Sequence, residues 1–106
     1  MIIITKVINC PGCNFANTAD FLAWHESKNG TDFKTWLEGK NTEGKLVYTT
    51  TTVLSPERVE NTYVFSDQAA ADEYHAKIAE TAMDDAITNL INSGEVIIES
   101  VTSEEV

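Results

Sequence analysis

Two cysteines separated by two residues are the clearest candidates for chemistry in this chain. Cys10 and Cys13 enclose Pro11-Gly12, a good turn, directly after an apolar run. We expect a helix to begin shortly afterwards, and a thiol near a helix N-terminus has a lowered pKa and reacts as a thiolate. Two thiolates can bind Cu(I), but a tetrahedral zinc site needs two further ligands. The pair is therefore a candidate metal or thiol-redox site, and a purely structural turn is the alternative.

Aromatic and polar residues form a second set of candidates, for binding an apolar ligand. His25 and His75 fall on different predicted helices, and Asn9 follows the first predicted strand. The aromatic residues are numerous for one small core, so they either fill that core or line a cavity between helices and a sheet. The candidate ligand-binding residues are Asn9, Phe21, Trp24, His25, Trp36, Tyr63 and His75.

Several other kinds of chemistry have no motif in the sequence. There is no Gly-rich phosphate loop, no His-Glu-x-x-His pair and no recognisable Ser-His-Asp set. The sequence thus gives no basis for a kinase, a zinc protease or a hydrolase. We assign no catalytic residue and expect no cofactor.

Two kinds of periodicity divide the chain into seven elements. Runs with a period of two and many β-branched or aromatic residues indicate strands, and apolar residues at steps of three and four indicate helices. Glycine, proline and asparagine separate these runs. The expected elements are a strand over residues 2–8, helices over 17–28 and 32–40, strands over 45–54 and 59–65, a helix over 68–92 and a strand over 95–101.

The helix boundaries follow from capping residues. Asn17 or Thr18 is a good cap for the first helix, and Asn29-Gly30 interrupts it, so the first helical region is a broken pair. Ser66 is the expected cap of the long helix, which Gly94 ends. The residues expected to point inward from the first pair are Phe21, Leu22, Trp24 or His25, Phe33, Trp36 and Leu37. The tail, residues 102–106, is expected to fray or to lie along a partner.

Length and charge narrow the range of partners. A chain of 106 residues is expected to form one domain over residues 1–106. The whole net charge of −10 comes from residues 54–106, which carry twelve acids against only Arg58 and Lys77. Nucleic acid and anionic membranes are therefore disfavoured as partners. The apolar start, MIIITKVI, is too short for a signal peptide or a membrane span. We expect a cytoplasmic protein, whose cysteines would normally be free thiols or metal ligands, not a structural bridge.

The element order predicts an α+β fold of the ferredoxin-like βαββαβ type. Right-handed crossovers then give a four-stranded antiparallel sheet of order 4-1-3-2 with the helices on one face. Isoleucines, valines and threonines remain on the other face, and a second copy of the chain is their natural cover. In this order, and in the strand, short cap and Ala-rich helix over residues 59–78, the chain resembles dimeric α+β barrel proteins, such as antibiotic-biosynthesis monooxygenase-like and stress-responsive barrel families. The resemblance implies a homodimer through the sheet face.

The position of the cysteine pair also resembles two other families. Thioredoxin-like proteins carry C-x-x-C after the first strand, but they need a cis-proline before a hairpin, whereas Pro56 falls in the predicted hairpin turn. Heavy-metal-associated domains share the βαββαβ order and carry C-x-x-C in the first loop. Their usual methionine two residues before the first cysteine is Ile8 here.

These features give two hypotheses for function. The first is a small-ligand-binding α+β barrel protein, with an apolar ligand of fatty-acyl or polyketide type between helices and sheet. Cofactor-independent oxygenase or isomerase activity is an extension of this hypothesis. The second is a thiol-redox or metal-binding protein that acts through Cys10 and Cys13.

Overall fold

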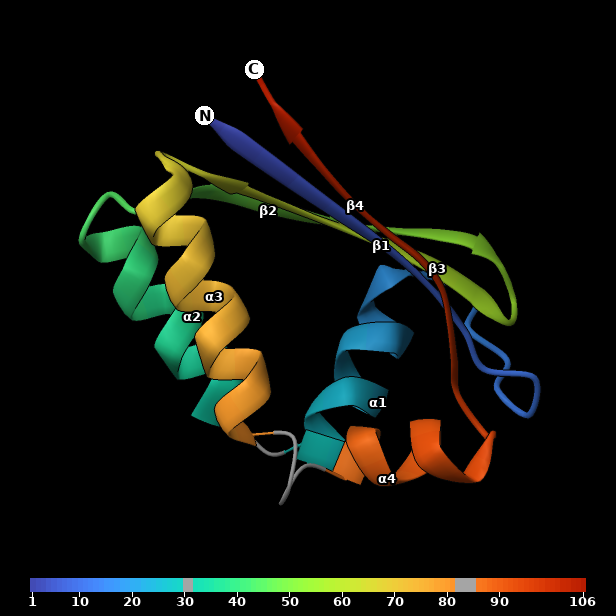
Figure 1. Ribbon diagram of the computed structural model, residues 1–106. Coiled ribbons are helices and arrows are strands. Elements are labelled where there is room, and N and C mark those ends of the chain that lie inside the picture. The colour runs from blue at the N-terminus through green and yellow to red at the C-terminus, as the bar shows by residue number, and fades with distance from the viewer. Residues whose placement is uncertain (30–31, 82–85) are drawn as a thin grey trace.

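The computed structural model describes residues 1–29, 32–81 and 86–106. These residues form four strands and four helices (Figure 1). The broken first helical region is confirmed, since α1 ends at Asn29 and α2 begins at Asp32. In chain order the elements are β1 (Ile2–Asn9), α1 (Thr18–Asn29), α2 (Asp32–Thr42), β2 (Leu46–Ser55), β3 (Arg58–Phe65), α3 (Gln68–Thr81), α4 (Ala86–Ser93) and β4 (Ile97–Glu105).

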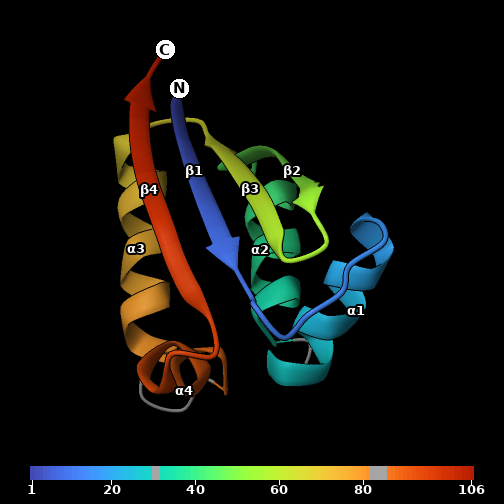
Figure 2. The ribbon, with the colours of Figure 1, turned by 90° about the vertical axis from the view of Figure 1, so that its right-hand side faces the viewer.

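The strands form one antiparallel sheet with the helices on a single side. The order along the sheet is β2-β3-β1-β4, which reads β4-β1-β3-β2 from the opposite edge. Every neighbouring pair is antiparallel. Two views at right angles show the helices on the same side of the sheet and the other side uncovered (Figures 1 and 2). The prediction of an α+β protein with a four-stranded antiparallel sheet is confirmed.

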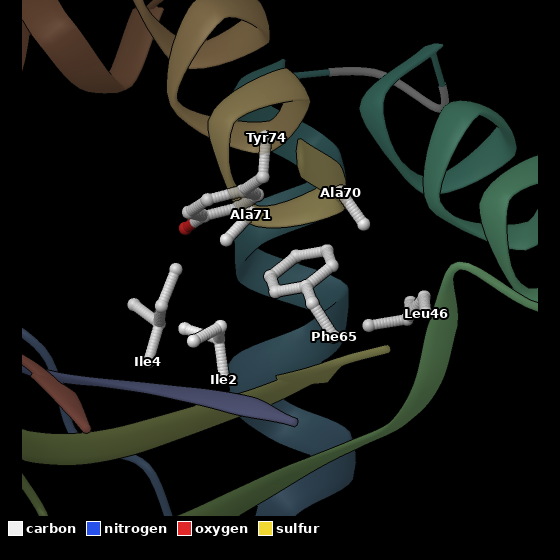
Figure 3. Close-up of a cluster of buried hydrophobic side chains, with 7 residues drawn as sticks. All are labelled: Ile2, Ile4, Leu46, Phe65, Ala70, Ala71 and Tyr74. Carbon is white, nitrogen blue, oxygen red and sulfur yellow. The ribbon is translucent and has the colours of Figure 1, made fainter. Parts of the chain in front are cut away.

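The first core cluster joins α3 to the sheet (Figure 3). Ile2 and Ile4 alternate along β1 on the face that carries the helices, as the period of two requires. Tyr74 from α3 is fully buried above them and lies 5.3 Å from Phe65, centroid to centroid. The small side chain of Ala71 allows α3 to approach this closely. Leu46 from β2 and Ala70 complete the cluster.

A second, separate core cluster lies at the other end of the sheet. It joins the loop after β1 to α1 and to the end of α4, and its buried members are Cys10, Phe15, Phe21, Val59 and Val96. Phe15 meets Phe21 edge to face, with ring centroids 5.5 Å apart. The sheet therefore supports two apolar clusters, one packed against α2 and α3 and the other against α1 and α4.

Side-chain caps start the helices that carry these clusters. Asn17 Oδ1 accepts a hydrogen bond from the Asp20 backbone N–H at 2.9 Å, which confirms Asn17 as a cap. The cap of α3 is Asp67, whose Oδ1 accepts from the Ala70 N–H at 2.8 Å, and not Ser66 as the sequence suggested. A carboxylate at this place also complements the helix dipole.

Two predictions about the second half were wrong. The expected single helix over residues 68–92 consists of α3 and α4, which run in different directions (Figure 2); residues 82–85 lie outside the described part. The tail, expected to fray or to lie along a partner, is instead the second half of β4, where Thr102 to Glu105 pair with Thr5 to Ile2 of β1 in the same chain. Without that pairing, β1 would leave its backbone groups unpaired along one edge.

The uncovered face of the sheet carries a row of threonines across all four strands. Thr5 of β1 pairs with Thr102 of β4 and with Thr62 of β3, and Thr62 in turn pairs with Thr50 of β2. Paired residues of antiparallel strands lie on the same face, so their side chains stand side by side. We call this set the threonine row. It is mildly polar and carries no charge of its own.

Candidate functional site

A cavity of about 570 Å³ lies between the first helix pair and the sheet. The helices α1 and α2 meet near residues 29 and 32 and diverge towards the strands (Figure 1). The cavity therefore lies where the two core clusters fail to merge. Its lining residues are Phe21, Leu22, His25, Glu26, Phe33, Lys34, Leu37, Glu38, Asn41, Thr42, Leu46, Tyr48, Thr49, Thr51, Asn61 and Tyr63.

The floor of the cavity is built from β2 and β3 and is polar. Asn61 and Tyr63 are two residues apart on β3, so both side chains point to the helix-bearing face. Asn61 is only 5% exposed, and its Oδ1 accepts a hydrogen bond from Thr51 Oγ1 at 2.8 Å. Thr49 donates its hydroxyl to the Thr62 carbonyl oxygen at 2.9 Å. The floor thus presents an amide, a phenol and two hydroxyls to an otherwise largely apolar space.

Behind the floor, Tyr63 belongs to a buried group of polar side chains that also includes Tyr74 and Lys6. Its ring centroid lies 5.0 Å from that of Tyr74. Burial raises the pKa of Tyr63 to about 12, against a smaller opposing effect of the neighbouring Tyr74 hydroxyl. Burial, and then the proximity of Tyr63, also raises the pKa of Tyr74. Both phenols are therefore neutral hydrogen-bond donors at physiological pH.

Lys6 completes this buried group. Its Nζ lies 4.8 Å from the centroid of the Tyr74 ring, a cation–π arrangement. Burial lowers the pKa of Lys6 to about 8. On the sheet, Lys6 is the cross-strand partner of Asn61, so it lies next to the cavity floor without lining it.

The walls of the cavity come from the two diverging helices. Phe21, Leu22 and His25 line it from α1, whereas Phe33 and Leu37 line it from α2. Leu22 was expected to be inward, but it is 51% exposed because the cavity, and not the core, lies beside it. For the same reason α2 has no fully buried residue among those described. Near the entrance the charged residues are Glu26, Lys34 and Glu38.

Three of the seven predicted ligand-binding residues line this cavity: Phe21, His25 and Tyr63. The other four lie elsewhere. Asn9 is on the uncovered face, where its Nδ2 donates to Glu99 Oε1 at 3.4 Å, and His75 is exposed on α3 beside Tyr74. Trp24 packs in the second core cluster, and Trp36 stacks on Phe33 at 6.0 Å between centroids. The two histidines are therefore on separate helix pairs and do not form one site.

Sequence reasoning missed Asn61, Thr51 and Lys6. The position of Asn61 could have been predicted, because Val59, Asn61 and Tyr63 alternate along β3 and therefore point to the same face of the sheet. A polar residue in a series of inward positions is the signal of a polar cavity floor, since polar groups are rarely buried without a purpose.

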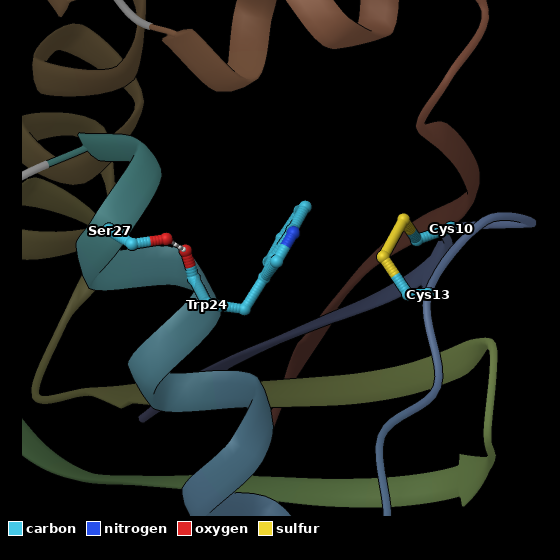
Figure 4. The surroundings of a disulfide bond; sticks show 4 residues. All are labelled: Cys10, Cys13, Trp24 and Ser27. Atoms are coloured by element: carbon cyan, nitrogen blue, oxygen red, sulfur yellow. Dashed lines mark hydrogen bonds between the residues drawn. A yellow bond between two sulfur atoms is a disulfide. The ribbon is translucent and has the colours of Figure 1, made fainter.

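Cys10 and Cys13 form a disulfide bond, in contrast to the free thiols expected from the sequence (Figure 4). The loop that holds them is fixed by backbone hydrogen bonds to the β2–β3 turn: Cys10 N donates to Glu57 O at 2.8 Å and Phe15 N to Pro56 O at 2.7 Å. The indole of Trp24 lies between α1 and the disulfide (Figure 4). Cys10 is buried and Cys13 partly exposed. Because α1 begins only at Thr18, the pair is not at a helix N-terminus as expected.

Within residues 1–29, 32–81 and 86–106, no group of three or more histidine, cysteine or acidic side chains is arranged to hold a metal ion. In the same residues, no helix is both long and apolar enough to cross a membrane. Comparison with known proteins found no matching family model, no matching curated protein and no matching solved structure.

Proposed function

We propose that this protein binds an apolar small molecule in the cavity between α1, α2 and the sheet. The observation that carries the proposal is the cavity itself. Its volume of about 570 Å³ falls within the roughly 300–1,000 Å³ typical of small-molecule sites. Apolar walls from two helices and a few polar groups on one side are the usual composition of such a site. A fatty-acyl or polyketide-like molecule fits this description.

The first experiment is mass spectrometry of the purified protein under native and denaturing conditions. We expect an apolar small molecule that is retained under native conditions and released on denaturation. Binding of Nile red, a neutral apolar dye, then locates the site. Leu22→Trp places a large ring in the cavity and should weaken dye binding, whereas Leu54→Trp should not. Leu54, on β2, is the matched control, because it is about as exposed as Leu22 but lies outside the cavity.

Two results would contradict the proposal. One is a protein that carries no small molecule and does not bind Nile red saturably. The other is dye binding that responds to Leu54→Trp and not to Leu22→Trp, which would place the apolar site elsewhere.

We further propose that the fold is ferredoxin-like and that two copies pair through their uncovered sheet faces, as in dimeric α+β barrels. The element order and the one-sided helices support this proposal. The threonine row and the adjoining Ile3 offer a weakly polar surface for another sheet, whereas Val64 beside Ile3 is already buried within the chain. Such a pairing would not cover the helix-bearing side of the sheet, where the cavity lies (Figure 2).

A catalytic extension of the binding function is proton transfer within the bound ligand. His25 lies on the wall opposite the donors of the floor, so an isomerase would use it as the base. Oxygenation without a cofactor is the other extension. Loss of ligand isomerisation in His25→Gln, with Nile red binding retained, would support an enzyme. An equal rate of isomerisation in His25→Gln and in the wild-type protein would exclude His25 as the base.

Thiol-disulfide exchange through Cys10 and Cys13 is a second candidate function, favoured by the disulfide and by the partial exposure of Cys13. A dithiol would attack the more accessible Cys13 sulfur and release Cys10 as the thiolate. We expect a redox-active pair to be reduced by millimolar dithiothreitol in the folded state. A bond that resists reduction until the protein unfolds would assign the pair to structure.

A further inference from the structure

The floor of the cavity offers an amide donor that the described part of the protein does not use. The Asn61 side chain lies in a residue that is only 5% exposed, and its Oδ1 accepts a hydrogen bond from Thr51 Oγ1. Asn61 Nδ2 makes no hydrogen bond within the described residues, and it is not one of their fully enclosed polar atoms without a partner, so it is open to the cavity. An amide nitrogen carries two N–H donors. A donor that faces a cavity and is not used by the protein can bind an acceptor of a ligand in place of water.

A second donor lies beside the first. Tyr63 follows Asn61 by two residues on the same face of β3 and also lines the cavity. Residues so spaced have their side chains side by side, about 7 Å apart at the backbone. The amide and the phenol can therefore converge on one oxygen atom of a ligand.

The surroundings favour an uncharged acceptor over an anion. Glu26 and Glu38 line the cavity from the helices against one lysine, Lys34, and the chain has a net charge of −10. Lys6 adjoins Asn61 on the sheet, but its Nζ lies over the Tyr74 ring, and Lys6 is not among the lining residues. The floor thus has donors but no cation among its described residues, and the lysine of the cavity, Lys34, lies on the α2 wall.

We infer that Asn61 and Tyr63 recognise a carbonyl oxygen, so that the ligand of this cavity is an apolar molecule with a ketone, ester or amide group. The inference rests on the proposed binding function and names the chemical class of its ligand. The carbonyl oxygen accepts hydrogen bonds from Asn61 Nδ2 and the Tyr63 hydroxyl, while the apolar body lies between Phe21 on α1 and Leu37 on α2.

Two probes of the same shape test this inference. 2-Acetylnaphthalene carries a carbonyl oxygen, and 2-isopropenylnaphthalene has a CH₂ group in its place. Because each neutral hydrogen bond contributes roughly 0.5–1.5 kcal/mol, we expect the ketone to bind about tenfold more tightly than the hydrocarbon to the wild-type protein.

Single substitutions assign the difference to the two donors. Tyr63→Phe and Asn61→Leu should each weaken ketone binding about three- to tenfold and leave hydrocarbon binding nearly unchanged, because each removes roughly one hydrogen bond. Thr50→Val is the control, since it deletes a hydroxyl from an exposed residue of β2 that does not line the cavity. It should change neither affinity. Thermal unfolding of each variant verifies its fold, and Tyr63→Phe serves alone if Asn61→Leu does not fold.

The inference is overturned if the hydrocarbon binds the wild-type protein as tightly as the ketone, or if Tyr63→Phe weakens both probes equally. These results would leave an apolar binding site without carbonyl recognition. If neither probe binds and no small molecule copurifies, the proposed function fails together with the inference.

Discussion

At the scale of residues, the centre of the first core cluster is Tyr74, an aromatic side chain whose hydroxyl makes no hydrogen bond within the described residues. Tyr74 is fully buried, and so is this hydroxyl. Tyr74→Phe removes this group and keeps the ring, so it should be as stable as the wild type or more stable by up to about 1 kcal/mol. Tyr74→Ala should lose about 3–5 kcal/mol by opening a cavity. Urea unfolding of both variants measures the difference, and a destabilised Tyr74→Phe would reveal a hydrogen bond of the hydroxyl.

Lys6 is the second residue whose burial has a measurable cost. Its pKa is lowered from 10.5 to about 8 in the folded chain, so below pH 8 the folded protein bears the full cost of a poorly solvated ammonium. Between about pH 8 and 10.5 the unfolded chain binds more protons, and the free energy of unfolding therefore rises with pH through this group. We expect Lys6→Met to be about 1–3 kcal/mol more stable at pH 7, because one pKa unit corresponds to about 1.4 kcal/mol.

The pH dependence distinguishes this effect from a simple gain in packing. The advantage of Lys6→Met should shrink when urea unfolding is repeated at pH 9.5. Lys28→Met, which changes an exposed lysine, should show little effect at either pH. An advantage that stays constant between the two pH values would contradict the lowered pKa.

At the scale of elements, the disulfide closes a very short loop. Cys10 and Cys13 are three residues apart, so the bond restricts the unfolded chain only slightly. The chain-entropy relation gives about 2 kcal/mol for a loop of this size, and measured values are commonly lower. We expect Cys10→Ser with Cys13→Ser to fold and to lose about 1–2 kcal/mol in urea unfolding. Failure to fold would mean that the bond organises the second core cluster.

The elements also show where sequence reasoning succeeded and where it did not. The strands were predictable because runs such as LVYTTTTVL are β-branched, and the interruption at Asn29-Gly30 was predictable from residue type. The change of direction between α3 and α4 was not, because apolar steps of three and four continue across it without Gly or Pro. The end of β4 has the polar sequence TSEE, and only its partner β1 makes it a strand. Likewise, the cavity depends on the separation of α1 and α2, and the hydrophobic periodicity of the sequence does not predict how far apart two helices lie.

At the scale of the whole molecule, the proposed dimer is the most direct prediction. Thr62 lies in an inner strand of the sheet and in the middle of the threonine row. Thr62→Glu would place a buried, unpaired charge in the contact of two copies, so it should convert a dimer to a monomer in sedimentation velocity at micromolar concentration. Thr35→Glu, an exposed site on α2, is the control and should leave the dimer intact. A wild-type protein that sediments as a monomer would contradict the proposed pairing.

The pairing of the first strand with the last has a consequence for the order of events during synthesis. Met1 and Val106 exchange backbone hydrogen bonds of 3.0 and 2.9 Å, and β1 is held between β3 and β4. While a ribosome makes the chain, β1 emerges first but gains its two neighbours only after residues 58–65 and 97–105 have followed. Contacts between such distant segments slow folding. Until then, the isoleucine-rich β1 has unpaired edges that can join another nascent chain. Productive folding is therefore expected only after β4 has left the ribosome, and chaperone protection of the first eight or nine residues would matter most before that moment.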